Sequence, residues 1–138
     1  MEVQFVASIA PIVRDAEAAS AFYVGALGLT FEGGAGEYRY TERLPGTKHF
    51  GLWPLAEAAE ACFGTGEWPG DVPVPQASIE FEVPDVPAAA AELEAKGYRL
   101  LHGARTEPWG QVTARLLSPE GLLAAVCYTP PFHDEPSP

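Results

Sequence analysis

The chain has 138 residues, of which 47% are hydrophobic, and its 19 acidic and 8 basic residues give a formal net charge of −11. This length suits one packed domain, or two small modules that share a sheet. The acidic surplus argues against nucleic acid or an anionic membrane as a partner and favours a cationic ligand, unless it serves only to keep the protein soluble.

The cysteines and the N-terminal sequence indicate the compartment. Cys62 and Cys127 show no paired spacing, which fits a reducing environment better than a disulfide scaffold. The first residues lack the basic and apolar regions of a signal peptide, and no segment approaches membrane-spanning length. We therefore expect a cytoplasmic protein with no membrane partner.

The second half of the chain repeats the first. Residues 78–97 have a weaker copy at residues 8–28, in which equivalent positions lie 70 residues earlier. Each copy reads as an alternating strand, an aspartate at the helix N-cap (Asp15 or Asp85), an alanine-rich helix and a glycine stop. The repeat therefore predicts two β-α units.

The rest of the pattern extends each unit to a βαβββ module within one α+β domain. Strands are predicted at 3–13, 29–32, 37–44 and 49–55 in the first half and at 78–83, 98–102, 111–117 and 122–128 in the second, with helices at 15–27 and 85–96. We divide the chain into a first module at 1–55, a linker at 56–76, a second module at 77–129 and a frayed, proline-rich tail at 130–138.

Four short motifs accompany this tandem arrangement: V-R-D at 13–15, A-F-Y at 21–23, E-P-W-G at 107–110 and S-P-E-G at 118–121. Together they make residues 3–128 resemble the glyoxalase/bleomycin-resistance/extradiol-dioxygenase superfamily, also called vicinal oxygen chelate. The resemblance implies that the two modules curl into an open, cup-like half-barrel and that two chains form a homodimer. It leaves the activity open, because one fold hosts many functions.

The resemblance also locates four metal-ligand positions. Metal-dependent members carry His, Gln or Glu at equivalent points on four strands, and these points fall here on Ser8, Ser78, Ala125 and about Gly51. A serine hydroxyl is a poor ligand for a divalent ion, and alanine and glycine side chains offer no donor atom. The resemblance therefore points to the metal-free, bleomycin-resistance-like branch, with no cofactor.

Aromatic residues are the candidates to fill the cup. Trp109 corresponds to the tryptophan that the bleomycin-resistance branch places beside its ligand cleft, and strand alternation points other rings inward with position 51. The predicted ligand contacts are Trp109, Trp53, Tyr40, Tyr38, His49 and Glu80, with Trp68 and Phe63 of the linker closing the mouth. Such rings suit a flat, conjugated ligand.

Several of these residues have a second interpretation. Trp53 and Tyr40 could pack a core or a dimer interface instead, and Glu80 could be a solvated sheet residue. His49 could be a base, a hydrogen-bond donor or a surface residue, and we place His102 and His133 on the surface.

We favour a metal-free binding protein over an enzyme. It would sequester an aromatic antibiotic or natural product and so confer resistance, and the acidic charge of the chain favours a cationic ligand. The alternative is a lyase, isomerase or dioxygenase with a displaced metal site, or a metal-free enzyme that uses His49 and Glu80 as acid and base. A third possibility is a structural or regulatory module whose cup is filled by its own rings.

Overall fold

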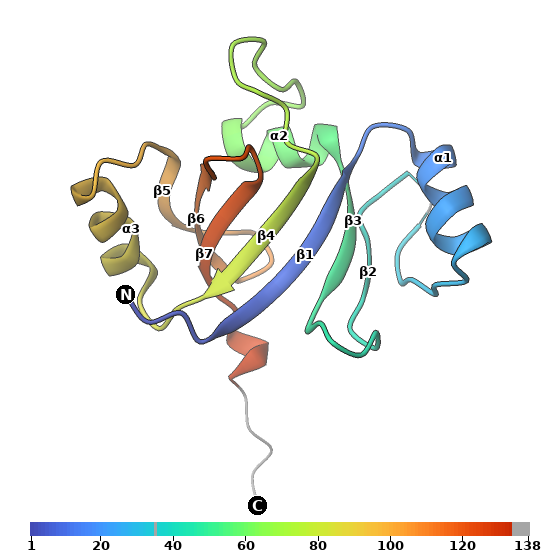
Figure 1. The fold of residues 1–138 in the computed structure, drawn as a ribbon, viewed down its shortest axis with the longest axis horizontal. Coiled ribbons are helices and arrows are strands. Elements are labelled where there is room, and N and C mark those ends of the chain that lie inside the picture. Colours follow the sequence, from blue (N-terminus) through green and yellow to red (C-terminus); the bar gives the residue numbers. More distant parts are fainter. Residues whose placement is uncertain (35, 134–138) are drawn as a thin grey trace, which may run out of the picture.

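The computed structural model describes residues 1–34 and 36–133 and contains a seven-stranded mixed sheet in the order β2-β3-β1-β4-β7-β6-β5 (Figure 1). The strands are β1 (Phe5–Val13), β2 (Arg39–Thr41), β3 (Phe50–Pro54), β4 (Ala77–Glu82), β5 (Leu100–Thr106), β6 (Val112–Leu117) and β7 (Leu123–Tyr128). The helices are α1 (Ala16–Ser20), which continues as the π-helix η1 (Ala21–Ala26), α2 (Leu55–Phe63), α3 (Val86–Ala95) and the 3-10 helix η2 (Pro130–Phe132).

The internal repeat appears in the sheet as an approximate two-fold symmetry. β1 and β4, the first strands of the two modules, pair antiparallel with Ile9 opposite Ile79, and each pairs parallel with the last strand of its own module, β3 or β7. The sheet curls without closing, so the predicted α+β half-barrel is confirmed.

The predicted helix boundaries follow from their caps. Asp15 accepts a hydrogen bond from the Ala18 amide and Asp85 from the Ala88 amide, both at 3.0 Å. Gly28 and Gly97 follow the two helices with φ of 75° and 92°, a left-handed conformation that glycine adopts at least cost.

The first module is less regular than predicted. Its expected strand at 29–32 is reduced to one bridge between Glu32 and Tyr40. Gly33 follows with φ of 98°, and a Cβ built there would lie 2.5 Å from the Tyr38 carbonyl oxygen, so the chain turns away from the ladder at a point that only glycine fits. The predicted linker at 56–76 holds most of α2.

Two clusters form the core on opposite faces of the sheet. Under α3, on the outer face, lie Val83, Val86, Ala89, Ala90, Ala114 and Val126; on the inner face, under α2, lie Ala10, Trp53, Ala58, Cys62 and Leu123. α2 contacts β1, β3 and β5 and closes one end of the cup (Figure 1). Within residues 1–34 and 36–133, no helix has the length and apolar character needed to cross a membrane.

Candidate functional site

The inner face of the sheet encloses a cavity of about 810 Å³, which is large enough for a drug-sized ligand. Six of the eight predicted contacts line it: Tyr38, Tyr40, His49, Trp53, Glu80 and Trp109. Ser8 and Ser78 also line it. Strand alternation therefore places the two repeat serines and Glu80 on the cavity side, as expected.

One wall of the cavity is a stack of aromatic rings. The His49 ring lies nearly parallel to Tyr40 and Tyr38, with centroids 5.1 and 5.9 Å away, and Tyr38 meets Trp53 edge-on at 6.4 Å. Gly51 makes this arrangement possible, because a Cβ there would lie 2.7 Å from Cζ of Tyr38 and closer still to its hydroxyl oxygen. The Tyr38 ring thus fills the space that any side chain at position 51 would need.

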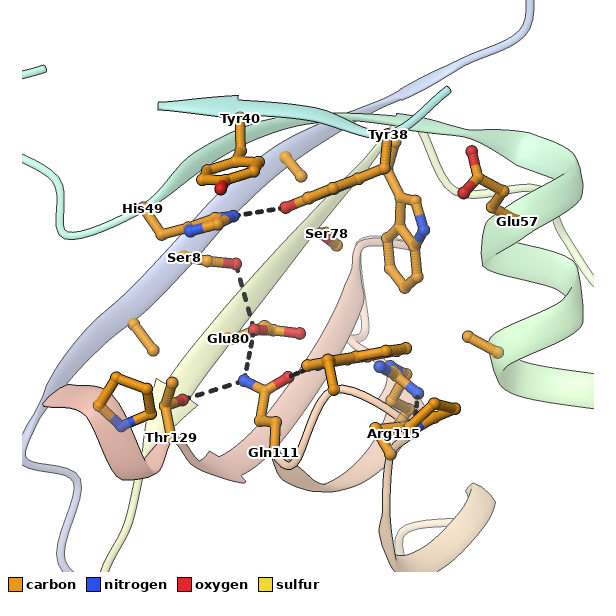
Figure 2. A pocket seen from close by; sticks show the side chains of 18 of the residues that line it. Ser8, Tyr38, Tyr40, His49, Glu57, Ser78, Glu80, Gln111, Arg115 and Thr129 are labelled. Carbon is orange, nitrogen blue, oxygen red and sulfur yellow. Dashed lines mark hydrogen bonds and ion pairs between the residues drawn. The ribbon is translucent and has the colours of Figure 1, made fainter. Parts of the chain in front are cut away.

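A hydrogen-bonded chain runs through this wall. The Tyr38 hydroxyl lies 2.6 Å from Nε2 of His49 (Figure 2). Nδ1 of His49 lies 3.0 Å from a carboxylate oxygen of Glu42. With the imidazole proton on Nδ1, His49 donates to Glu42 and accepts from Tyr38. Burial and the negative charges of Glu80 and Glu42 raise the pKa of Tyr38, so its phenol stays protonated at neutral pH.

The floor of the cavity is polar and ordered by Glu80. Oε1 of Glu80 accepts hydrogen bonds from the Ser8 hydroxyl at 3.2 Å and from the Gln111 amide at 3.1 Å (Figure 2). The Gln111 amide also donates to Thr129, and its carbonyl accepts from the Trp109 indole at 2.9 Å. Trp109 is 60% exposed, yet this bond orients its ring at the cavity mouth.

A buried ionic cluster forms the opposite wall. Nη1 of Arg115 donates to Oε1 of Glu107 at 2.9 Å and to Nε2 of His102 at 3.1 Å. The same Glu107 oxygen accepts from Arg105 at 3.0 Å and from Thr113 at 2.8 Å. Burial raises the pKa of Glu107, but these hydrogen bonds and the charge of Arg115 outweigh it and leave the pKa lowered.

Arg115 is not fully satisfied by this cluster. Its side chain is 1% exposed, and its buried Nε and Nη2 atoms have no hydrogen-bond partner among residues 1–34 and 36–133. Each such donor costs roughly 1–3 kcal/mol relative to a bonded one. The guanidinium carbon lies 5.4 Å from the Trp53 ring centroid, a cation–π contact that offsets part of this cost.

Strand register aligns the two charged walls. Ser8 pairs with Glu80, Glu80 with Ala125, Ala125 with Arg115 and Arg115 with His102, so these residues form one row across five strands. Paired residues on neighbouring strands point to the same face. Only the Ala125 methyl group therefore stands between Glu80 and Arg115.

The two remaining predicted contacts lie elsewhere. Phe63 and Trp68 do not line the cavity; their rings meet edge-on at 4.9 Å and pack against the inner core cluster. The Trp68 indole donates to the carbonyl oxygens of Val72 and Pro73 at 3.0 and 3.2 Å. These contacts fold residues 63–73 back on themselves, so both rings serve the packing of the connection.

The C-terminal segment differs from the expected frayed tail. Glu82, which is fully buried, accepts hydrogen bonds from the Thr129 hydroxyl at 2.9 Å and from His133 at 2.6 Å. These bonds hold η2, and Pro130, Pro131 and Phe132 line the cavity. His133 and His102 are both partly buried and hydrogen-bonded, so their predicted surface placement is wrong; residues 134–138 lie outside the described residues.

The residues at the metal-ligand positions do not fit a divalent ion. The Ser8 hydroxyl is a neutral group that donates to Glu80, the Tyr38 ring fills the space beside Gly51, and Ala125 has no donor atom. In the part of the chain that the structure describes, no three His, Cys, Asp or Glu side chains form a group able to hold a metal.

Four residues of the site were not predicted as site residues from the sequence: Arg115, Glu107, Gln111 and Glu42. Arg115 carried a usable signal: it is a charged residue in the otherwise uncharged predicted strand 111–117, and alternation with Ala114 and Leu116 puts it on the other face. Glu42 carried a similar signal, since alternation along the predicted strand 37–44 puts it on the same face as Tyr38 and Tyr40.

Comparisons with known proteins identify the family of the chain. Residues 6–126 match the family described as the Glyoxalase/Bleomycin resistance protein/Dioxygenase superfamily. No curated protein matches the chain.

Solved structures with a similar fold include a superfamily member from Vibrio splendidus 12B01 (TM-score 0.54, 17% identity, 93% of this chain and 100% of that one). A methylmalonyl-CoA epimerase variant from Streptomyces coelicolor has a TM-score of 0.53 and 21% identity over 99% and 100% of the two chains. A hypothetical protein from Bacillus halodurans C-125 has a TM-score of 0.60 and 18% identity over 97% of each. The family match spans most of the sequence, and the chain belongs to the glyoxalase/bleomycin resistance protein/dioxygenase superfamily.

Proposed function

We propose that this protein binds an aromatic small molecule in its cup without a metal ion and withholds it from its target. The observation that carries the proposal is the large cavity between the Tyr38–Tyr40–His49 stack and the two tryptophans Trp53 and Trp109. Stacking on such rings adds roughly 0.5–1.5 kcal/mol per aromatic pair beyond the burial of apolar area. In a producing or exposed cell, sequestration of an antibiotic or natural product would confer resistance.

The charges around the cavity support a cationic group on the ligand. Five carboxylates and two guanidinium groups line it, and Glu80 uses only Oε1 for its hydrogen bonds to Ser8 and Gln111. Its second carboxylate oxygen is left for an ammonium group. Carboxylates at the mouth also attract a cation during its approach.

Tryptophan fluorescence tests this proposal directly. A panel of polycyclic and glycopeptide antibiotics is titrated into wild type and into W68F, which removes the indole outside the cavity. We expect a compound that quenches both proteins saturably and that mass spectrometry recovers unchanged after incubation. If that compound no longer quenches W53F or W109F, its binding site is the cup. The absence of any quenching across the panel would refute the proposal.

The Glu42–His49–Tyr38 chain favours one second function, metal-independent proton transfer. If His49 carries both of its protons, it donates to Tyr38, whose hydroxyl is then free to give its proton to a ligand oxygen. Glu80 would take a proton from the ligand. Incubation of a ligand that binds, followed by mass spectrometry in deuterated water, distinguishes this function from sequestration: exchange or conversion that disappears in Y38F supports it, and unchanged ligand rejects it.

We also propose that the protein forms a homodimer. Val6 and Ile9 on the central strand β1 are each 39% exposed, although apolar residues in the middle of a sheet are usually covered. Sedimentation at micromolar concentration tests this: we expect a dimer that I9E converts to monomer, and a monomeric wild type would contradict it.

A further inference from the structure

One buried side chain, the amide of Gln111, joins three walls of the cavity. Gln111 is 7% exposed and lies directly before β6, between the turn that carries Trp109 and the floor. We propose that Gln111 is a positioning residue: it holds the Trp109 ring over the cavity mouth and so sets how tightly an aromatic ligand binds. This role rests on the proposed binding function, in which Trp109 contacts the ligand.

Both N–H groups and the carbonyl group of the Gln111 amide have partners. Nε2 donates to Oε1 of Glu80 at 3.1 Å and to Oγ1 of Thr129 at 3.0 Å (Figure 2). The side-chain carbonyl oxygen accepts from the Trp109 indole at 2.9 Å. Thr129 is itself held, since its hydroxyl donates to the buried Glu82 at 2.9 Å. The amide is therefore anchored on the floor and on the C-terminal wall where it meets Trp109.

The Gln111 amide fits these neighbours in one orientation. If the amide were flipped, its carbonyl oxygen would face a carboxylate oxygen of Glu80, and its NH2 group would face the indole N–H of Trp109. Two acceptors, or two donors, do not hydrogen-bond to each other, so both neighbours disfavour the flip. Glu80 therefore keeps the Gln111 carbonyl directed at Trp109.

Trp109 needs such a partner because the residue is 60% exposed. Two main-chain hydrogen bonds close its turn: Gly110 N–H donates to the Glu107 carbonyl at 2.9 Å, and Glu107 N–H donates to the Gln111 carbonyl at 2.7 Å. They fix the backbone of Trp109 but not its χ angles, and exposed side chains change rotamer within nanoseconds. Among the described residues, Gln111 is the one hydrogen-bond partner of the indole, so it selects the rotamer in which the ring lines the cavity.

A ring that is already in place loses less freedom when a ligand stacks on it. The freedom that one mobile side chain loses on binding corresponds to about two- to tenfold in affinity. We therefore expect loss of the Gln111 bond to weaken the binding of a stacking ligand by about this factor. Because Gln111 also lines the cavity, the experiment has to separate its action through Trp109 from direct contact with the ligand.

The first measurement needs no ligand. Heteronuclear NMR relaxation compares the mobility of the tryptophan indole N–H groups in wild type and in Q111M, which removes the amide at nearly constant side-chain size. In wild type we expect Trp109 to be as rigid as Trp68, whose indole donates to backbone carbonyls. In Q111M, Trp109 should become mobile while Trp53 and Trp68 do not change. Equal mobility of Trp109 in the two proteins would overturn the inference.

Two further variants complete this measurement. Q76M makes the same substitution at an exposed glutamine outside the cavity lining and should leave every indole unchanged. If Q111M does not fold, Q111N takes its place, because it keeps an amide but is too short to reach all three partners. The same mobility of Trp109 is then expected, and a rigid Trp109 in Q111N overturns the inference.

The second measurement tests the consequence for binding. The probe 2-naphthylmethylammonium is titrated by calorimetry into wild type, Q111M, W109A and the double variant. We expect Q111M to bind it about two- to tenfold more weakly than wild type and to have no further effect in the W109A background. An equal loss of affinity in the W109A background would overturn the inference, since Gln111 would then act without Trp109. Absence of binding by wild type would contradict the proposed function, whereas the NMR comparison would still decide the role of Gln111.

Discussion

Glu80 and Arg115 face the same side of the sheet, two strands apart, and the side chain between them is the methyl group of Ala125. They are bonded to different partners: Glu80 to Ser8 and Gln111, and Arg115 to Glu107 and His102. Among the described residues, Oε2 of Glu80 takes no part in these bonds, and Nε and Nη2 of Arg115 are buried without a hydrogen-bond partner. The floor of the cup is polar because Glu80 and Arg115 lie in one row of the sheet and are kept apart by Ala125.

Because Gly51 lies against the Tyr38 ring, we expect position 51 to be sensitive to substitution. In G51A the new methyl group would displace the Tyr38 ring from His49, which should lower the free energy of unfolding by about 1–3 kcal/mol in urea titrations. G66A is the matched control, since a Cβ at position 66 meets nothing within 4 Å and should change stability little. Equal stability of the two variants would contradict the crowding at position 51.

Because the pKa of His102 is lowered in the folded protein, we expect the protein to lose stability in acid. Because this pKa is lowered in the folded state, first by burial and then by Arg115, the unfolded chain binds a proton at higher pH than the folded one. The contribution of neutral His102 to the free energy of unfolding is complete above about pH 6.5. It declines as the pH falls from there toward the folded-state pKa, by at most about 1.4 kcal/mol per pH unit. Urea titrations at several pH values should show a shallower decline for H102Q, and an identical decline would contradict the assignment.

The two thiols should be unreactive in the folded protein. Burial raises the pKa of Cys62 to about 11, and burial together with the charges of Glu80 and Glu82 raises the pKa of Cys127 further. At pH 8 both are protonated, and a thiol reacts with Ellman's reagent only as the thiolate. We expect slow reaction in native protein and two rapid equivalents in guanidinium chloride; a fast native equivalent that C62S abolishes would show that Cys62 is exposed.

We expect Glu82 to stabilise the C-terminal segment that contains η2. It accepts hydrogen bonds from Thr129, His133 and Cys127 while fully buried, so E82A leaves several donors unpaired and should cost about 3 kcal/mol or more. E94A, at an exposed site on α3, should change stability by about 0.5 kcal/mol or less. Similar losses in the two variants would argue against the buried cluster.

Local signals in the sequence predicted the elements of the fold, and the family resemblance predicted its curled half-barrel. The aspartate caps and the glycine stops determine the helix ends because each acts within a few residues, and the repeat predicts two like modules. One exception is the segment 29–32, where the propensity for a strand loses to the conformation that Gly33 adopts beside Tyr38. The predicted linker and tail are two others, since they hold α2 and η2.

The site was less accessible to sequence reasoning. Alternation placed His49, Trp53 and Glu80 in the cup, but it does not reveal partners on distant strands. The Glu42–His49 and Glu82–His133 contacts depend on how a hairpin and the C-terminal turn pack. The buried, unpartnered nitrogens of Arg115 depend on how the chain brings Glu107 and His102 to its Nη1 atom. These are tertiary properties with no periodic signature.

Metal-independent binding is most directly tested by titrating one quenching ligand into W68F before and after exhaustive dialysis against a chelator, followed by addition of divalent ions. We expect one site per chain with the same dissociation constant in all three conditions. Binding that disappears with the chelator and returns with an ion would contradict it.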